Sequence, residues 1–176
     1  MRVACESIVG MFIILNGPLG IGKSTLAEAL TESIDHCAMI SGDCLLAANP
    51  PPADELEHLH SAIALLVAHH RRAGYRHFII EHIWRTPAEL GDLRGRLTAL
   101  DPDARIYCFL LVLPAEENLR RIERRQRGRA IDERDFELRT FAAERETLRN
   151  ASDVGEPFDV SAPPSELVLR MRQRLL

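Results

Sequence analysis

The segment from Gly17 to Ser24 carries the clearest chemistry in this chain. It reads Gly-Pro-Leu-Gly-Ile-Gly-Lys-Ser, which has the spacing of a phosphate-binding loop. Glycines let the backbone curl so that its N–H groups point at phosphate oxygens, and a following helix adds its dipole. In this pattern Lys23 reaches the β- and γ-phosphates and the Ser24 hydroxyl binds Mg²⁺. We predict a nucleotide site formed by Gly17, Pro18, Leu19, Gly20, Ile21, Gly22, Lys23, Ser24 and Thr25.

The use of lysine and arginine in this chain supports a special role for Lys23. The chain contains 22 basic side chains, and Lys23 is the one lysine among them. Everywhere else the sequence uses arginine for a positive charge. A single lysine in that background indicates a position that arginine does not serve.

Three further polar segments follow apolar runs. Gly42-Asp43 comes after the run Cys37–Ile40, and the segment Glu81–Arg85 comes after Phe78–Ile80. An arginine-rich segment follows the longest apolar run, Ile106–Leu113. In parallel α/β sheets the ligand lies beyond the carboxyl ends of the strands, so these segments are candidates to share one site with the phosphate loop.

With its motifs in this order, the chain from Met11 onward resembles the small P-loop kinases, a family that includes adenylate, shikimate, gluconate and chloramphenicol kinases. The resemblance implies ATP and Mg²⁺ as cofactors and a small-molecule phosphate acceptor. Several of these kinases begin shortly before their first strand, where Met11 lies. We therefore expect residues 1–10 to be an extension or a misplaced start, and residues 11–176 to form a single kinase domain.

Asp43 is the predicted acceptor residue. Its surroundings, Ile40-Ser41-Gly42-Asp43-Cys44-Leu45, are similar to the Gly-Asp-x-Leu segment of gluconate and adenylate kinases. The resemblance implies that Asp43 orients the acceptor hydroxyl and takes its proton, or that it contributes to the metal site. We expect it to face the same crevice as Lys23. The alternative is an aspartate that caps a helix or turn.

Glu81 and Arg85 occupy positions similar to the Asp and Arg of the Asp-Gly-Phe-Pro-Arg-Thr segment of adenylate-kinase-like enzymes. The resemblance implies that Glu81 holds Mg²⁺ through water and that Arg85 binds an anionic part of the substrate. A surface charge pair at the strand end is the alternative. Trp84, between them, is expected either to wall the substrate pocket or to pack in the core.

The arginine-rich segment lies where the family places its lid, about residues 120–134. Arg124 and Arg127 are one helical turn apart, so both can face the nucleotide, and guanidinium groups bind phosphate oxygens in pairs. We expect residues 126–132 to be mobile, with Gly128 as a hinge. The alternatives are a solvated charged helix and a nucleic-acid surface. The arginines are Arg120, Arg121, Arg124, Arg125, Arg127, Arg129 and Arg134.

Together these features predict an ATP- and Mg²⁺-dependent phosphotransferase that acts on the hydroxyl of a sugar, sugar acid or antibiotic. A nucleoside monophosphate kinase is the first alternative, but Leu46 stands where adenylate kinases carry an arginine for the acceptor phosphate. Shikimate kinase is disfavoured because its Asp-x-Asp is replaced by Ser41-Gly42-Asp43. A regulatory NTPase without an acceptor is the second alternative, although an arginine-rich lid favours a kinase.

Strand and helix patterns alternate along the chain, which predicts an α/β fold with a five-stranded parallel sheet and helices on both faces. The expected strands are 11–15, 37–40, 78–80, 106–113 and 158–160. The expected helices are 24–34, 54–72, 86–100, 116–127, 132–149 and 165–176.

Composition excludes several other classes. Of the 176 residues, 46% are hydrophobic and 27% are charged, which is typical of a globular domain. A net charge of −4 argues against general nucleic-acid binding, and no apolar run is long enough to cross a membrane. We expect a cytoplasmic monomer or homodimer whose four cysteines are free thiols, mostly buried. The clustered histidines are expected to be ordinary surface or core residues.

Overall fold

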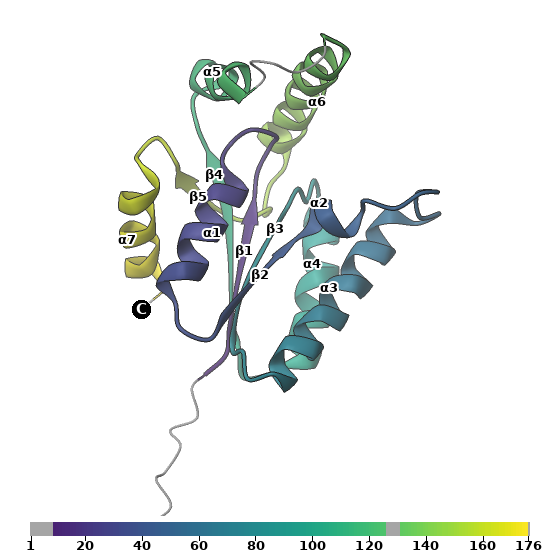
Figure 1. Ribbon diagram of the computed structural model, residues 1–176, viewed down its shortest axis with the longest axis vertical. Helices are drawn as coiled ribbons and strands as arrows, with labels where there is room; N and C mark the ends of the chain where they lie inside the picture. The colour runs from purple at the N-terminus through teal and green to yellow at the C-terminus, as the bar shows by residue number, and fades with distance from the viewer. Residues whose placement is uncertain (1–8, 126–130, 176) are drawn as a thin grey trace, which may run out of the picture.

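The computed structural model describes residues 9–125 and 131–175. Its centre is a five-stranded sheet in the order β2-β3-β1-β4-β5, with every neighbouring pair parallel (Figure 1). This confirms the predicted α/β class. The strands are β1 (Met11–Asn16), β2 (Cys37–Ser41), β3 (His77–His82), β4 (Arg105–Val112) and β5 (Glu156–Asp159). The helices are α1 (Lys23–Ser33), α2 (Gly42–Leu45), α3 (Glu55–Arg72), α4 (Pro87–Leu100), α5 (Ala115–Arg125), α6 (Ile131–Asn150) and α7 (Pro164–Arg174).

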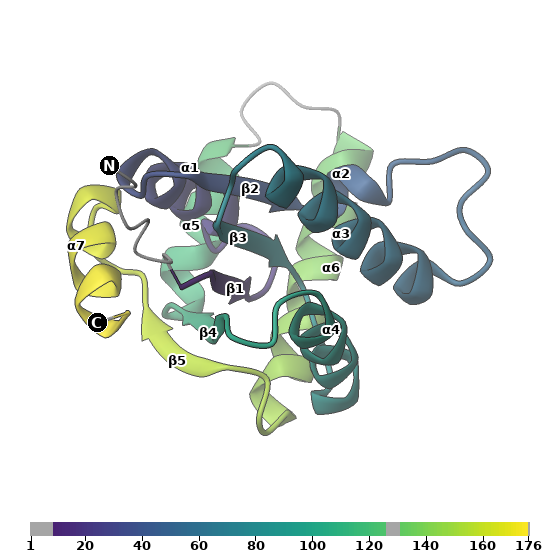
Figure 2. The same ribbon diagram turned by 90° about the horizontal axis from the view of Figure 1, so that it is seen from below.

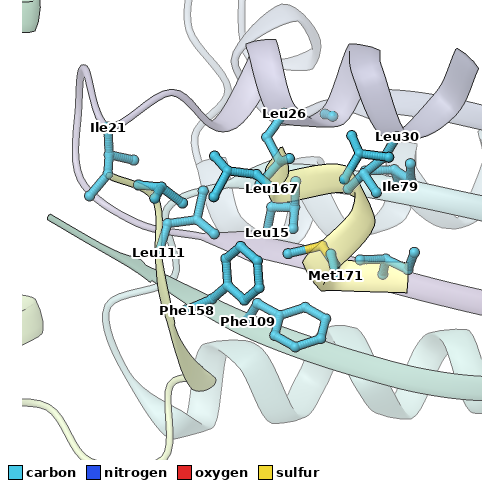
Figure 3. Packing of buried hydrophobic residues seen from close by; sticks show 14 of the residues in the cluster. Leu15, Ile21, Leu26, Leu30, Ile79, Phe109, Leu111, Phe158, Leu167 and Met171 are labelled. Atoms are coloured by element: carbon cyan, nitrogen blue, oxygen red, sulfur yellow. The ribbon is translucent and has the colours of Figure 1, made fainter. Parts of the chain in front are cut away.

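Both faces of the sheet are covered, because successive strand residues point to opposite sides. Ile13 and Leu15 of β1 pack with residues of α1 and α7 in one buried cluster (Figure 3). Phe12 and Ile14, one residue out of step, pack with residues of α3 and α4 on the other face. Helices α5 and α6 stand beyond the carboxyl ends of the strands, as Figures 1 and 2 show. The sheet edge predicted to hold the site therefore lies under these two helices.

Most predicted elements differ from the observed ones by a few residues at their ends, and two differences bear on the site. The short helix α2, which contains Asp43, was not predicted. Strand β3 runs two residues further than its apolar pattern, because Glu81 and His82 are buried with polar partners. The order of the strands, for which the sequence carried no prediction, places β3 between β2 and β1.

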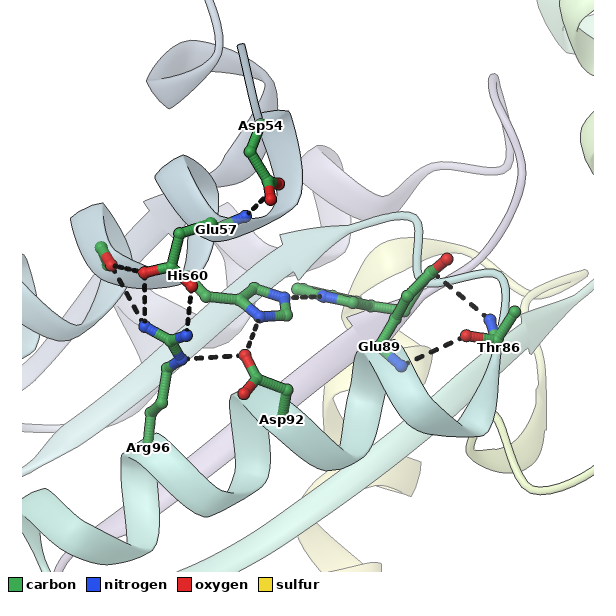
Figure 4. A network of polar contacts seen from close by, with 9 residues as sticks. Asp54, Glu57, His60, Thr86, Glu89, Asp92 and Arg96 are labelled. Atoms are coloured by element: carbon green, nitrogen blue, oxygen red, sulfur yellow. Dashed lines mark hydrogen bonds and ion pairs between the residues drawn. The ribbon is translucent and has the colours of Figure 1, made fainter. Parts of the chain in front are cut away.

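A polar network joins α3, α4 and Trp84, which follows the end of β3, and its centre at His60 is buried (Figure 4). Nε2 of His60 accepts a hydrogen bond from Nε1 of Trp84 at 3.0 Å. Since an indole only donates, Nδ1 of His60 carries the hydrogen and donates to Asp92 at 2.7 Å. Arg96 bonds Asp92 and reaches Glu57 on α3. Both His60 and Trp84 are fully buried, so His60 is a core histidine and Trp84 packs in the core instead of walling a pocket.

Local signals explain where these two helices begin. Asp54 caps α3 by accepting from the Glu57 N–H at 2.9 Å. Thr86 and Glu89 form a reciprocal capping box at the start of α4, with Pro87 in the first turn (Figure 4). Only a short segment, which contains Arg85, separates the end of β3 from the capped first turn of α4. The backbone at Arg85 therefore has little freedom to move.

The predictions for the cysteines and for membrane-spanning helices can be compared directly with the structure. Among the described cysteines, all free, Cys37 is buried, Cys108 is half-buried and Cys44 is exposed. Over residues 9–125 and 131–175, no helix combines the length and apolar character that crossing a bilayer requires.

Candidate active site

The phosphate loop connects the buried strand β1 to α1. Gly22, the residue before α1, has a φ of 102°, a left-handed conformation that favours glycine, and it supplies no side-chain cap to the helix. The first N–H groups of α1 are thus directed at the loop, where an anion is favoured. Nζ of Lys23 donates to the carbonyl oxygens of Gly17 at 2.9 Å and Pro18 at 3.2 Å. The lysine therefore lies along the loop that its charge is predicted to serve.

Helices α5 and α6 hold this loop from above. Asn118 donates to the Leu19 carbonyl at 3.4 Å, and Arg121 donates to the Ile21 carbonyl at 3.3 Å. Glu144 accepts from the Leu19 N–H at 2.7 Å. Sequence reasoning did not point to Asn118 or Glu144, and it named Arg121 only as one of seven arginines in the expected lid. Their contacts join positions that are 99 to 125 residues apart, so no local pattern pointed to them.

One pocket brings together most of the predicted site. It is lined by Lys23, Ser24 and Thr25 of α1, by Asp43 of α2 and by Glu81 of β3, with Leu19, Gly20 and Gly22 of the loop. Strand β3, next to β1, carries Glu81 to the loop, and β2 brings Asp43 in from the far side of β3. Phosphate-binding groups and two carboxylates thus face one small space.

Asp43 is held by His82, a residue that sequence analysis did not assign to the site. Nδ1 of His82 lies 2.9 Å from Oδ1 of Asp43. This hydrogen bond lowers the pKa of the Asp43 carboxyl below its usual 3.8; partial burial opposes the shift, and the charges of His82 and Lys23 add to it. Gly42 makes the approach possible, because a Cβ there would lie 2.7 Å from the His82 ring. Asp43 is not a helix cap in this structure: Ser41 precedes α2 and Asp43 lies within it.

Glu81 is not part of a surface charge pair, because its side chain is only 1% exposed. Its Oε1 accepts from the Ser41 hydroxyl at 2.5 Å. Within residues 9–125 and 131–175, no hydrogen-bond partner reaches its Oε2. A buried carboxylate oxygen on a residue that lines the same pocket as Ser24 suits the oxygen ligands that Mg²⁺ prefers. Across the described ranges no three His, Cys, Asp or Glu side chains form a metal cluster, so a cation here would also need phosphate and water ligands.

Arg85, predicted to bind an anionic substrate, faces an acidic side chain. Its Nη2 lies 3.6 Å from Oε1 of Glu144, and its side chain is 48% exposed. Glu144 therefore contacts both Arg85 and the phosphate loop. The structure gives Arg85 an intramolecular partner that the sequence did not reveal.

A second cavity of about 430 Å³ lies beside the loop, on the side of β5. Gly20, Gly22 and Thr25 line it together with Arg121, Arg124 and the turn from Val160 to Pro164. Arg121 also donates to the Val160 carbonyl at 2.9 Å, so it joins the loop to this turn. Arg124 is exposed at the cavity. Arg127 and residues 126–130 lie outside the described residues, and the lid remains a prediction.

The comparisons with known proteins agree with this geometry. A sequence-family model described as an AAA domain (AAA_33) matches residues 12–151. The chain belongs to this family. A search of curated protein sequences gave no match.

Solved structures show the same fold. A gluconokinase from Sinorhizobium meliloti is 17% identical, with a TM-score of 0.63, and the match covers 94% of this chain and 95% of that one. A sugar kinase from a Janibacter species is 19% identical, with a TM-score of 0.64 and 94% coverage of both chains. A shikimate kinase from Bacteroides thetaiotaomicron is 16% identical, with a TM-score of 0.56 and 94% and 98% coverage. The AAA-domain chain thus has the fold of the small P-loop kinases, as its motifs indicated.

Proposed function

We propose that this protein is an ATP-dependent kinase that transfers the γ-phosphoryl group to a hydroxyl of a small molecule. The observation that carries the proposal is the single pocket in which Lys23 and Ser24 of the phosphate loop meet the carboxylates of Asp43 and Glu81. Phosphoryl transfer depends mainly on positioning and on electrostatic stabilisation, and this pocket supplies groups for both.

Each side chain has a distinct role in this proposal. Lys23 and the N–H groups of the loop bind the phosphates and stabilise the charge that spreads over the moving group. Ser24, with Glu81 through water, would hold Mg²⁺, which would neutralise part of the charge of the phosphates. We assign the cavity beside the loop, which Arg121 and Arg124 border, to the rest of the nucleotide.

Asp43 acts on the acceptor. Its carboxylate accepts the hydrogen bond of the acceptor hydroxyl and so aims the oxygen at the γ-phosphorus. As the new O–P bond forms, the bond to the bridging oxygen of ADP breaks and the hydroxyl proton passes to Asp43. A carboxylate of low pKa is a weak base, but a loose transition state transfers this proton late and requires mainly orientation.

The test uses two variants of the full chain. Lys23→Ala is expected to weaken binding of MgATP measured by calorimetry. Asp43→Asn is expected to retain MgATP binding and to lower kcat by about 10²-fold or more, the scale of a positioned acid–base group. Asp35→Asn is the control for the latter, because Asp35 is exposed in the turn before β2, at the opposite end of the sheet.

Turnover with and without acceptors separates the proposal from its alternatives. A kinase is nearly silent with ATP alone and releases ADP when an acceptor is added, whereas a regulatory NTPase hydrolyses ATP in either case. Nucleoside monophosphates belong in the panel, although Leu46 packs partly buried against the core and places no charge at an acceptor phosphate. Acceptor-independent hydrolysis that survives Asp43→Asn would contradict the kinase assignment.

A further inference from the structure

Glu144 of α6 is a largely buried carboxylate placed against the tip of the phosphate loop. Its side chain is 11% exposed, and its Oε2 accepts from the Leu19 N–H at 2.7 Å. Leu19 lines the same pocket as Lys23 and Asp43. Helix α6 therefore carries a negative charge to the rim of the pocket proposed for phosphoryl transfer.

The second carboxylate oxygen of Glu144 retains bonding capacity. Nη2 of Arg85 lies 3.6 Å from Oε1, which is beyond the range of a direct hydrogen bond. A carboxylate oxygen has two lone-pair sites, so Oε1 can accept from a donor on a bound molecule while Arg85 stays nearby. Arg85 is half-exposed, so one member of this pair is open to solvent.

The charges around this rim disfavour an acidic acceptor. Arg85 already faces Glu144, and Lys23 is assigned to the nucleotide phosphates. Asp43 and Glu81 line the adjoining pocket, and Oε2 of Glu81 is buried without a hydrogen-bond partner among the described residues. A carboxylate or phosphate on the acceptor would meet like charges here, whereas an ammonium group would meet carboxylate oxygens able to accept its hydrogen bonds.

We propose that Glu144 determines the specificity of the acceptor site and selects hydroxylated compounds that carry a protonated amine. The ammonium group bonds Oε1 of Glu144 while the hydroxyl that receives the phosphoryl group lies at Asp43. This inference rests on the proposed kinase function. It narrows the class of acceptors to amines and excludes the sugar acids, which were among the acceptors expected from the sequence.

The first experiment measures kcat/KM with MgATP for acceptors in matched sets. Each set shares one scaffold and differs in charge: glucosamine, glucose and glucuronate, or 2-amino-1,3-propanediol, glycerol and glycerate. On a scaffold that reacts, the amine is expected to exceed the neutral compound by at least about 10-fold, since the pairing with Glu144 is charge-assisted. It is expected to exceed the acid by at least about 100-fold, because the acid meets like charges.

The second experiment isolates the charge of Glu144. The amide oxygen that Glu144→Gln introduces still accepts from the Leu19 N–H, so the contact with the loop is retained. The ratio of kcat/KM between amine and neutral acceptor is expected to fall to about 1 in this variant. Glu146→Gln, on the exposed side of the same helix, is the matched control and should keep the wild-type ratio.

Several outcomes overturn the inference. One is a preferred acceptor that is a carboxylate or phosphate, especially if Arg85→Gln abolishes its use. Another is an amine preference that Glu144→Gln leaves unchanged. If acceptors are phosphorylated in an Asp43-dependent way without any amine preference, the kinase assignment stands and this inference is wrong. If no acceptor reacts, and none binds in the presence of Mg²⁺ and a non-hydrolysable ATP analogue, both are wrong.

Discussion

At the scale of single residues, the orientation of Asp43, the proposed acceptor base, depends on His82, which belongs to no recognised sequence motif. His82 directs Oδ1 of Asp43 through a 2.9 Å contact and packs edge-on against Trp84. It lowers the pKa of a carboxyl that is already ionised at neutral pH, because the usual value is 3.8. The useful effect of His82 is therefore orientation and not ionisation.

His82→Phe tests this positioning role. Phenylalanine keeps an aromatic ring against Trp84 but removes the donor, so the Asp43 pKa should rise towards its usual value and the carboxylate should lose its fixed direction. We expect kcat to fall by about 10-fold, with MgATP affinity retained. His82→Asn, whose amide nitrogen can replace Nδ1, should recover most of the loss. A kcat that His82→Phe retains and His82→Asn lowers would show that the ring matters only for packing.

The cysteines give a pH-dependent prediction at the same scale. Burial raises the pKa of the Cys37 thiol to about 11, and burial likewise raises that of Cys108 to about 11. Since only the thiolate reacts, each should be alkylated at pH 8 roughly 100-fold more slowly than an ordinary thiol, and faster as the pH rises. Of the three cysteines that the structure describes, Cys44 is exposed and should react first. Peptide mapping after iodoacetamide treatment measures each site, and rapid labelling of Cys37 in the native protein would contradict the expectation.

At the scale of elements, His60 of α3 is hydrogen-bonded both to Asp92 of α4 and to Trp84, which follows the end of β3. These bonds connect the two helices on one face of the sheet to the segment after β3. His60→Leu keeps the bulk but leaves the Trp84 indole N–H buried without its acceptor. The free energy of unfolding should fall by about 1–3 kcal/mol, the cost of an unsatisfied buried donor. His58→Leu, exposed on the same helix, should change it by less than about 0.5 kcal/mol.

A double-mutant cycle sharpens this test. In a Trp84→Phe background there is no N–H to satisfy, so His60→Leu should cost clearly less than in the wild type. Urea denaturation of the four proteins measures the coupling. An equal cost in both backgrounds would mean that the hydrogen bond contributes nothing and that His60 acts only through its volume.

At the scale of the whole molecule, stability comes from the two apolar layers between the sheet and its helices. Met171 of α7 is fully buried in the layer that α1 and α7 form with one face of the sheet (Figure 3). Leu169, two residues earlier, is 63% exposed. Met171→Ala should lower the free energy of unfolding by about 2–5 kcal/mol, because the cavity cannot fully collapse. Leu169→Ala should change it by less than about 0.5 kcal/mol, and denaturation curves of both compare them directly.

The sequence by itself predicted the phosphate-loop motif and its place in the fold, because Gly17–Ser24 is a contiguous segment between an apolar strand and a helix. It also determined the parallel α/β architecture, since apolar runs and helical periods alternate along the chain. It placed Asp43 and Glu81 at strand ends that converge on one edge, and in the structure both line one pocket with Lys23.

Only the tertiary structure decided what surrounds these groups. It paired Asp43 with His82, buried Glu81 against Ser41, and brought Glu144 to Leu19. Each of these contacts joins residues at least 39 positions apart, so no local periodicity predicts it. They depend on the order of the strands and on where α6 crosses the sheet edge, which are properties of packing and not of any single segment.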